Sequence, residues 1–128
     1  MDQQQAREYL LQKPFTVETF PFGKDVSVFK VKHKMFATLA IGKMGKGENE
    51  SDDTCWMNLK CDPQEAIMLR DIFPSVIPGY HMSKVHWNTI KLDGSVPQGE
   101  IERMIDNSFN LVVDNMPKAD QQSILVQL

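Results

Sequence analysis

The stretch 78–90, PGYHMSKVHWNTI, gathers side chains that could do chemistry. It holds two of the three histidines, one of the two tryptophans, a tyrosine and a lysine. His81 and His86 are five residues apart, which sends them to opposite faces of a strand. A metalloenzyme pair of the HExxH kind needs a spacing of four on a helix, which places both side chains on one face. The spacing therefore disfavours a two-histidine metal site.

Nucleophilic and phosphate-binding motifs are also missing from the sequence. Ser83 lies two or three residues from either histidine, a poor geometry for a serine and its base in an extended chain, and no GxSxG turn is present. The glycines of GKMGKG do not match GxxxxGK[ST]. Cys55 and Cys61 form no CxxC motif and are expected to be free thiols. We therefore expect no catalytic activity, no metal and no cofactor.

Length and composition indicate one folded unit. The chain has 128 residues, of which 41% are hydrophobic and 24% charged, as in ordinary globular domains. No apolar run reaches the 18 residues of a membrane-spanning helix, and the polar start MDQQQAREYLLQK does not resemble a signal peptide. We expect a single domain over residues 1–128, in the cytoplasm and without a membrane partner.

The charge is unevenly distributed along the chain. The net charge of −3 argues against a purely electrostatic nucleic-acid binder. Residues 24–46, however, hold six lysines against Asp25 alone, a local charge of +5. A local patch rather than the total charge sets the field that a ligand meets. A basic surface on an acidic protein is therefore expected.

Alternating apolar residues predict a β-hairpin centred near His33. Residues 26–31 (VSVFKV) and 35–41 (MFATLAI) are the two strands, joined by Lys32-His33-Lys34, a turn without the Asn-Gly pattern. Residues 15–22 and 55–60 predict two more strands, and residues 3–12 a short first helix. The segment 43–54 is glycine-rich and then acidic, which predicts a flexible loop.

Two further helices have recognisable starts. Asp62 and Pro63 suit the cap and first position, and Glu65 completes the spacing of a capping box; Pro74 ends this helix. The next helix begins near residues 95–98, with an apolar stripe at 101, 104, 105, 108, 111 and 112 until Pro117, and a short last helix covers about 118–126. Hairpins followed by helices predict an α+β fold, a curved antiparallel sheet with helices on one face.

The candidate binding residues come from the hairpin and from a strand predicted over 84–92. Alternation places Lys30, Lys32 and Lys34 on one hairpin face. In the later strand it puts Lys84, His86 and Asn88 on a polar face, opposite a core face that contains Trp87. The other interpretation is a solvated edge whose lysines prevent aggregation. The expected core consists of Phe29, Phe36, Trp87, Ile101, Ile105 and Leu111.

The order of short motifs resembles the YjbR/MmcQ family from about residue 14 to 118. The matching segments are FPFG at 20–23, VFKV at 28–31, KMFA at 34–37, NLK at 58–60, LR at 69–70, PGYHM at 78–82, KVHWNTI at 84–90, LDG at 92–94 and IDNSFNLV at 105–112. One departure is the turn Lys32-His33-Lys34, where the family often has a glycine before the lysine.

This resemblance implies a CyaY-like domain and a DNA-binding role for the sheet, likened to a double wing. We therefore expect a non-catalytic protein that contacts the DNA phosphate backbone, weakly or without sequence preference, through Lys30, Lys32, Lys34, Lys84, His86 and Asn88. The alternative is a protein-interaction module that uses the open sheet face and has no nucleic-acid activity. An enzyme acting on a small molecule has no supporting set of residues.

Overall fold

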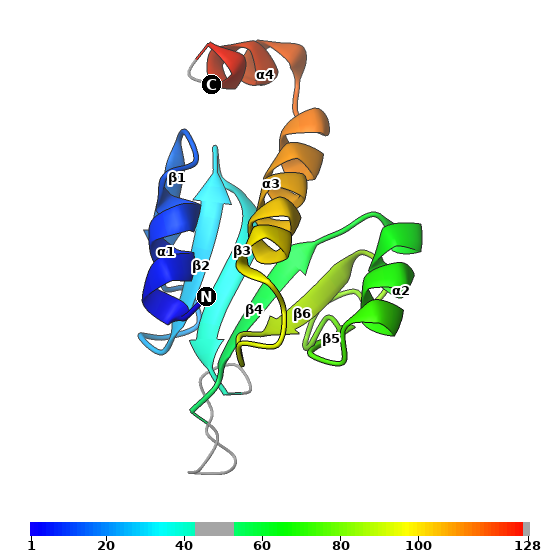
Figure 1. The fold of residues 1–128 in the computed structure, drawn as a ribbon. Helices are drawn as coiled ribbons and strands as arrows, with labels where there is room; N and C mark the ends of the chain where they lie inside the picture. Colours follow the sequence, from blue (N-terminus) through cyan, green and yellow to red (C-terminus); the bar gives the residue numbers. More distant parts are fainter. Residues whose placement is uncertain (43–52, 127–128) are drawn as a thin grey trace.

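A single six-stranded antiparallel sheet organises the molecule (Figure 1). The computed structural model describes residues 1–42 and 53–126, so most of the loop expected at 43–54 lies outside the described residues. The strands lie in the order β1-β2-β3-β4-β6-β5. Their bounds are β1 Thr16–Thr19, β2 Val26–Val31, β3 Lys34–Ile41, β4 Cys55–Lys60, β5 Val76–Pro78 and β6 Trp87–Lys91.

Four helices accompany the sheet and confirm the α+β class. They are α1 Gln3–Leu11, α2 Pro63–Ile72, α3 Gln98–Asp114 and α4 Lys118–Leu125. In Figure 1, α1 and α3 lie in front of the strands, and side chains from all four helices join one core on this side of the sheet. None of the helices over residues 1–42 and 53–126 is both long and apolar enough to cross a bilayer.

The β2–β3 hairpin has a two-residue turn. Val31 pairs with Lys34, so only Lys32 and His33 lie between the strands. Both have positive φ, 45° and 71°, as a type I′ turn requires. This conformation is usually supplied by Asn-Gly because side chains with a Cβ are disfavoured there. The hairpin is therefore where the sequence predicted it, although its turn residues are unusual.

The start of α2 differs from the expected capping box. The Asp62 carboxylate accepts hydrogen bonds from the backbone N–H groups of Gln64 and Glu65, at 3.1 and 3.2 Å, and so caps the helix as expected. The Glu65 side chain does not return to the cap. It reaches across to α3, where Arg103 Nη1 lies 2.6 Å from Glu65 Oε1. A tertiary ion pair has replaced the local contact.

The hydrophobic core lies between the sheet and the helices. Phe29, Phe36, Ile101 and Ile105 are fully or almost fully buried, which confirms four of the expected core residues. Phe36 meets the edge of Phe109 of α3, with ring centroids 5.3 Å apart and planes at 84°. Leu111 is only partly buried because it lies to one side of the apolar stripe.

A buried serine joins α3 to the sheet where two strands separate. Pairing of β3 with β4 stops at Ala37 and Leu59. Beyond that point Ser108 Oγ donates to the carbonyl of Phe36 at 2.6 Å and accepts from the backbone N–H of Lys60 at 2.9 Å. The hydroxyl thus satisfies backbone groups that no longer pair with each other.

The region of the sheet after α2 departs from the prediction. Strand β6 begins at Trp87, and residues 84–86 form a turn instead of extending the strand. The segment Val76–Pro78 forms the short edge strand β5 and pairs with β6. The cause is local: the Trp87 N–H bonds to the Ser83 carbonyl at 3.0 Å, which closes a turn just before the strand.

Candidate nucleic-acid interface

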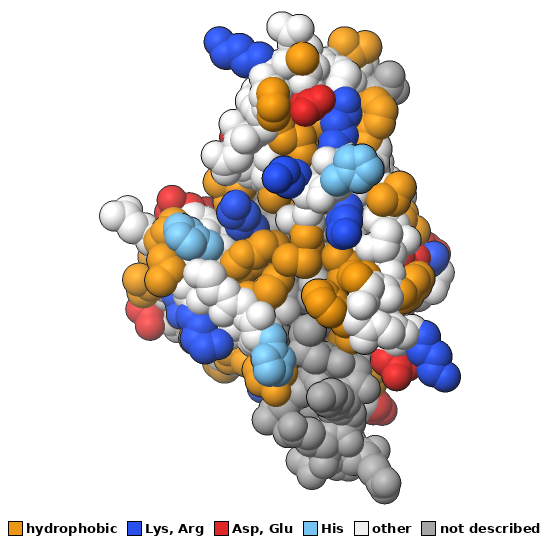
Figure 2. Space-filling view, turned by 180° about the vertical axis from the view of Figure 1, so that it is seen from behind, with side chains coloured by type: hydrophobic (Ala, Val, Ile, Leu, Met, Phe, Trp, Pro, Cys, Tyr) orange, Lys and Arg blue, Asp and Glu red, His pale blue; other side chains and the backbone are white. Residues whose placement is uncertain are grey.

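The candidate site lies on the sheet face opposite the helices, called here the open face. Side chains of Val26, Val28 and Ala40 form a small buried cluster there, with Met35 packed against it. Figure 2 shows this side of the molecule, where lysine and histidine side chains surround an apolar centre. The open-face positions of the strands include no aspartate or glutamate. They are Val17, Thr19, Val26, Val28, Lys30, Met35, Thr38, Ala40, Trp56, Asn58, Lys60, Ile77, Trp87, Thr89 and Lys91.

Three lysines gather where the hairpin end of β3 separates from β4. Lys34 and Lys60 line a hollow of about 220 Å³ together with Met35 and three residues at the end of α3. Lys30 is on β2, directly opposite Met35. None of the three lysines forms an ion pair with any residue in the described ranges 1–42 and 53–126. Lys30, Lys34 and Lys60 are called the lysine cluster below.

Lys30, Lys32 and Lys34 do not share one face, so the expected three-lysine row is wrong. Lys30 is on the open face, whereas Lys34 is paired with Val31, whose side chain is in the core on the helix side. The positive-φ turn interrupts the alternation, and Lys32 points toward α4. There its ammonium donates to Ser123 Oγ, lies 3.7 Å from Asp120 Oδ1, and sits 5.0 Å from the centre of the Phe15 ring. Lys60 takes its place in the cluster. Strict alternation along 55–60 could have found it, since Leu59 faces the core.

The two faces of β6 are reversed relative to the prediction. Asn88 is buried on the helix side, where its Nδ2 donates to the Ala66 carbonyl of α2 at 3.3 Å. Trp87, expected in the core, is only partly buried and is on the open face, opposite Lys60. Alternation correctly separated the two residues. The error was to assume that a polar side chain faces solvent, although a hydrogen-bonded amide can be buried.

Lys84 and His86 lie in the loop before β6 and not on a strand face. Both are exposed. Lys84 Nζ donates to the Gly79 carbonyl at 2.8 Å, and the backbone carbonyl of His86 accepts from the Cys61 N–H at 2.8 Å. The candidate residues Lys84, His86 and Asn88 are therefore not brought together in one row, and only the first two are accessible to a partner.

The loop 79–86 is held against the open face by buried polar groups. Thr89 Oγ1 donates to Asn58 Oδ1 and accepts from the Tyr80 N–H at 2.8 Å, while Asn58 Nδ2 donates to the Tyr80 carbonyl at 3.3 Å. At Gly79 a Cβ atom would lie 2.7 Å from the Trp87 Cβ, so only glycine fits. Much of the stretch PGYHM thus has a structural role.

Aromatic rings extend from this loop across the open face. Trp56 meets the Tyr80 ring edge-on at 5.7 Å, and Tyr80 in turn contacts the His81 ring at 4.2 Å. The ammonium of Lys91 lies 4.9 Å from the centre of the Trp56 ring. Trp56 is 7% exposed, so this ring mainly supports the loop. His81 has a φ of 58° and does not approach a metal-binding geometry with other ligands in the described part of the chain.

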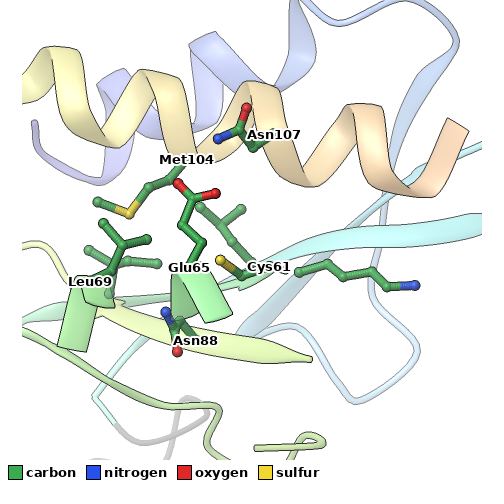
Figure 3. Close-up of a pocket in the computed structure, with 9 residues that line it drawn as sticks. Cys61, Glu65, Leu69, Asn88, Met104 and Asn107 are labelled. Atoms are coloured by element: carbon green, nitrogen blue, oxygen red, sulfur yellow. The ribbon is translucent and has the colours of Figure 1, made fainter. Parts of the chain in front are cut away.

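One cavity on the helix side is too small for a ligand. It lies between α2, α3 and β6 and has a volume of about 10 Å³ (Figure 3). Cys61, Glu65, Leu69, Asn88, Met104 and Asn107 are among its lining residues, and they come from α2, α3, β6 and the connection between β4 and α2. A space of that size holds at most one water molecule. This cavity therefore cannot accept a nucleotide or another metabolite.

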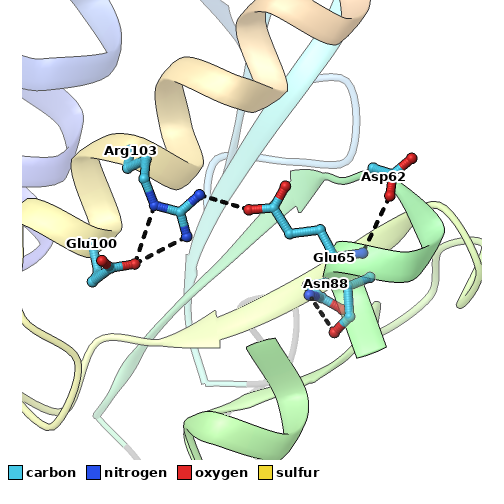
Figure 4. A network of polar contacts seen from close by, with 6 residues as sticks. Asp62, Glu65, Asn88, Glu100 and Arg103 are labelled. Carbon is cyan, nitrogen blue, oxygen red and sulfur yellow. Dashed lines mark hydrogen bonds and ion pairs between the residues drawn. The ribbon is translucent and has the colours of Figure 1, made fainter. Parts of the chain in front are cut away.

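Two cations on the helix side, Arg103 and Lys13, are paired with carboxylates within the protein. Arg103 binds Glu65 of α2 and, at 3.0 Å, Glu100 of its own helix (Figure 4). These two carboxylates hold the pKa of the Arg103 guanidinium above its usual value. Asp106 accepts from Lys13 and from the Tyr9 hydroxyl, and burial with this bond raises the Tyr9 pKa to about 12.

The two cysteines are poor nucleophiles where they lie. Burial raises the pKa of Cys55 to about 12, and burial with the nearby Glu65 and Asp62 carboxylates raises that of Cys61 to about 11. They stand at the two ends of β4, about 20 Å apart at strand spacing, too far for a disulfide. Both thiols are therefore protonated at neutral pH.

Comparisons with known proteins agree on the family. The YjbR family model matches residues 11–111. The uncharacterised protein YbdF of Escherichia coli O157:H7 is 34% identical over 93% of this chain and 90% of its own. YjbR of Escherichia coli K12, also described as uncharacterised, is 29% identical over 94% of both chains. The crystal structure of Deinococcus radiodurans DR2400, a DUF419 domain, aligns with a TM-score of 0.82 at 31% identity, covering 96% of this chain and 87% of DR2400. Motif order, sheet architecture and these matches together establish that the chain is a member of the YjbR family.

Proposed function

We propose that the open face binds the phosphate backbone of DNA in the cytoplasm, without catalysis. The observation that supports this proposal is the lysine cluster: Lys30 and Lys60 lie at one end of a sheet face whose strand positions hold no carboxylate, and Lys34 lines the adjoining hollow with Lys60. Cations that lack an internal counter-charge are the groups that gain most from a phosphate. Lys84, exposed in the loop beside β6, is a fourth candidate contact.

The remaining hairpin lysine provides a useful contrast. Lys32 already contacts Asp120, Ser123 and the Phe15 ring, so a phosphate would have to compete with these groups. Lys13 on the helix side is similarly paired with Asp106. The proposal therefore assigns backbone contact to Lys60 in place of Lys32 and removes Asn88 from the original set.

The proposed binding does not read sequence. Lysine ammonium groups act as point charges and lack the planar fork with which arginine recognises a base edge. No arginine is among the open-face strand residues. Affinity is thus expected to be similar for different sequences.

Fluorescence anisotropy with a labelled duplex at several salt concentrations tests the proposal. If Lys30, Lys34, Lys60 and Lys84 each neutralise one phosphate, log K falls with log[salt] with a slope of about −3.6. Lys60→Gln should reduce the magnitude of that slope by about 0.9. Lys32→Gln should reduce it less, because Lys32 is engaged with α4.

Lys118→Gln is the charge-matched control, since this exposed lysine begins α4, away from the open face. It should leave the slope unchanged. Equal slopes for wild type, Lys60→Gln and Lys118→Gln would contradict the proposal, and so would a wild-type slope near zero.

A second candidate function rests on α2. Ile67, Met68 and Ile72 are each about 60% exposed on the outer side of this helix, and a group of exposed apolar side chains is typical of protein-binding surfaces. We propose this surface as the site of the alternative, a protein-interaction role. A pull-down in which Met68→Lys loses a stoichiometric partner that Lys60→Gln retains would favour it; equal capture by both variants would argue against it.

A further inference from the structure

The open face combines the lysine cluster with an aromatic ring. Trp87 of β6 is directly opposite Lys60 of β4, and residues paired in this way have Cβ atoms about 5 Å apart. Trp87 is partly exposed, whereas the other tryptophan, Trp56, is 7% exposed and covered by Tyr80 and Lys91. Trp87 is therefore the tryptophan that a ligand bound to the lysines could touch.

The side chains form a row on four neighbouring strands, β2, β3, β4 and β6. Lys30 of β2 is paired with Met35 of β3, Met35 lines the same hollow as Lys60 of β4, and Lys60 is paired with Trp87 of β6. Neighbouring paired strands lie about 4.8 Å apart, which places the Trp87 ring one strand beyond Lys60, while the gap between β3 and β4 separates Lys60 from Met35. The row therefore alternates groups suited to phosphate with groups suited to a planar ring, since a thioether also packs well against aromatic faces.

A ring in this position distinguishes single strands from duplexes. In a duplex the flat faces of the bases are stacked inside, so a side chain lying within a sheet surface meets only phosphate and sugar. In a single strand each base exposes a face that can stack on an aromatic side chain while the adjacent phosphate meets a lysine. Lys60 and Trp87, on adjacent strands, are spaced to contact the phosphate and the base of one nucleotide.

We propose that the hairpin end of the sheet binds single-stranded polynucleotide, with phosphates on Lys30 and Lys60 of the open face and on Lys34 of the adjoining hollow, and with a base stacked on Trp87. This inference rests on the proposed function and narrows its ligand. Stacking does not depend on base identity, so the site tolerates any sequence. The salt slope on a single strand is shallower than on a duplex, about −0.7 for each phosphate neutralised.

Tryptophan fluorescence of single-tryptophan variants tests the stacking directly. Trp56→Phe leaves Trp87 as the reporter, and Trp87→Phe leaves Trp56, so the two variants are matched controls. Titration with an oligothymidine should strongly quench the tryptophan fluorescence of Trp56→Phe and only slightly quench that of Trp87→Phe. A duplex of equal length should quench the fluorescence of neither variant. Quenching confined to Trp56, or equal quenching of the two, would overturn the inference.

Affinity measurements separate the contribution of the Trp87 ring to binding from that of the lysine charges. Trp87→Ala should weaken oligothymidine binding by about 5- to 150-fold, the range measured for loss of one base–aromatic stack, and change duplex binding by less than about twofold. Trp87→Phe keeps a ring and should stay within about threefold of wild type on both ligands. Circular dichroism at the assay temperature confirms that each variant is folded.

The outcomes distinguish this inference from the proposed function. If Lys60→Gln weakens binding to single strands and duplexes but Trp87→Ala has no effect on either, phosphate binding stands and the single-strand assignment fails. If wild type binds neither ligand, both proposals fail. An oligouridine arm shows whether ribose is accepted: binding of oligothymidine, oligouridine or both with a Trp87 dependence supports the site and identifies its sugar.

Discussion

The two sides of the sheet differ in whether their cationic side chains form ion pairs within the protein. On the helix side, Arg103 is paired with Glu65 and Glu100, and Lys13 with Asp106, so these two cations meet carboxylates within the protein. At the hairpin end of the sheet, Lys30 and Lys60 of the open face and Lys34 of the adjoining hollow form no ion pair with a described residue. Like charges kept together cost stability. The face that bears this cost is the one that we propose for an anionic partner.

Polar burial also differs between the two faces. On the helix side a single hydroxyl, Ser108 Oγ, connects α3 to the backbone of two strands. On the open face Thr89, Asn58 and the Tyr80 backbone form a linked set that holds the loop 79–86 in place. One face uses polar groups to attach a helix and the other uses them to attach a loop. We expect substitutions in the helix-side core to lower the free energy of unfolding more than substitutions in this polar set.

The largest effect is expected from removing a ring of the core. Phe109 is 1% exposed and packs edge-on against Phe36. Phe109→Ala should lower the free energy of unfolding by about 3–5 kcal/mol, because it loses buried apolar area and leaves a cavity. Urea denaturation followed by circular dichroism measures this change.

Phe22→Ala is the matched control, since Phe22 is 65% exposed. It should change the free energy of unfolding by less than about 0.5 kcal/mol. Similar losses for Phe109→Ala and Phe22→Ala would show that the stability of the protein does not reside mainly on the helix side.

An intermediate effect is expected from the polar set beneath the loop. Thr89→Val keeps the side-chain shape but removes the hydrogen bonds of the Thr89 hydroxyl to Asn58 Oδ1 and to the Tyr80 N–H. Because these groups are buried, the variant should lose about 1–3 kcal/mol of unfolding free energy. Hydrogen exchange at the Tyr80 amide should also accelerate.

Thr19→Val tests whether this loss is specific to the set. Thr19 is also on the open face, but its hydroxyl makes only a 3.4 Å contact to the Val28 carbonyl. Its replacement should alter stability by less than about 0.5 kcal/mol. A Thr19→Val loss as large as that of Thr89→Val would mean that the open face is not organised by the Thr89–Asn58–Tyr80 set.

The smallest effect is expected in acid, at the turn that follows β6. Hydrogen bonds from Ser75 and from Ser95 lower the Asp93 pKa to about 2. Since the folded value lies below the unfolded one of about 3.9, Asp93 stabilises the fold above pH 4, and this contribution disappears as the pH falls toward 2. Because Asp93 is exposed, the contribution should stay below about 1 kcal/mol.

Thermal melts of wild type and Asp93→Asn between pH 2 and 7 measure this contribution. The difference in Tm should narrow as the pH falls from 4 to 2. The difference in Tm between wild type and Ser75→Ala should narrow over the same pH range, because the Ser75 hydroxyl is the largest cause of the lowered Asp93 pKa. A difference that stays constant from pH 7 to pH 2 would assign the Asp93 effect to the turn geometry alone.

Local patterns in the sequence were sufficient for most elements. The strands at 26–31 and 55–60 and the hairpin between Val31 and Lys34 follow from alternation, and α3 follows from its apolar stripe. Asp62 and Pro63 correctly marked the start of α2. These features depend on neighbours within a few residues, so the sequence displays their causes directly.

The sequence by itself determined that β6 has two distinct faces, and only the tertiary structure decided which face is covered. Alternation separates Trp87 from Asn88, but the position of α2, whose Ala66 carbonyl binds Asn88, is a property of the folded chain. The tertiary structure also decides which lysines form ion pairs. Lys32 meets Asp120, 88 positions away, while Lys60 meets no carboxylate of the described residues. Ion pairs and buried hydrogen bonds join residues distant in the chain, and no local pattern specifies them.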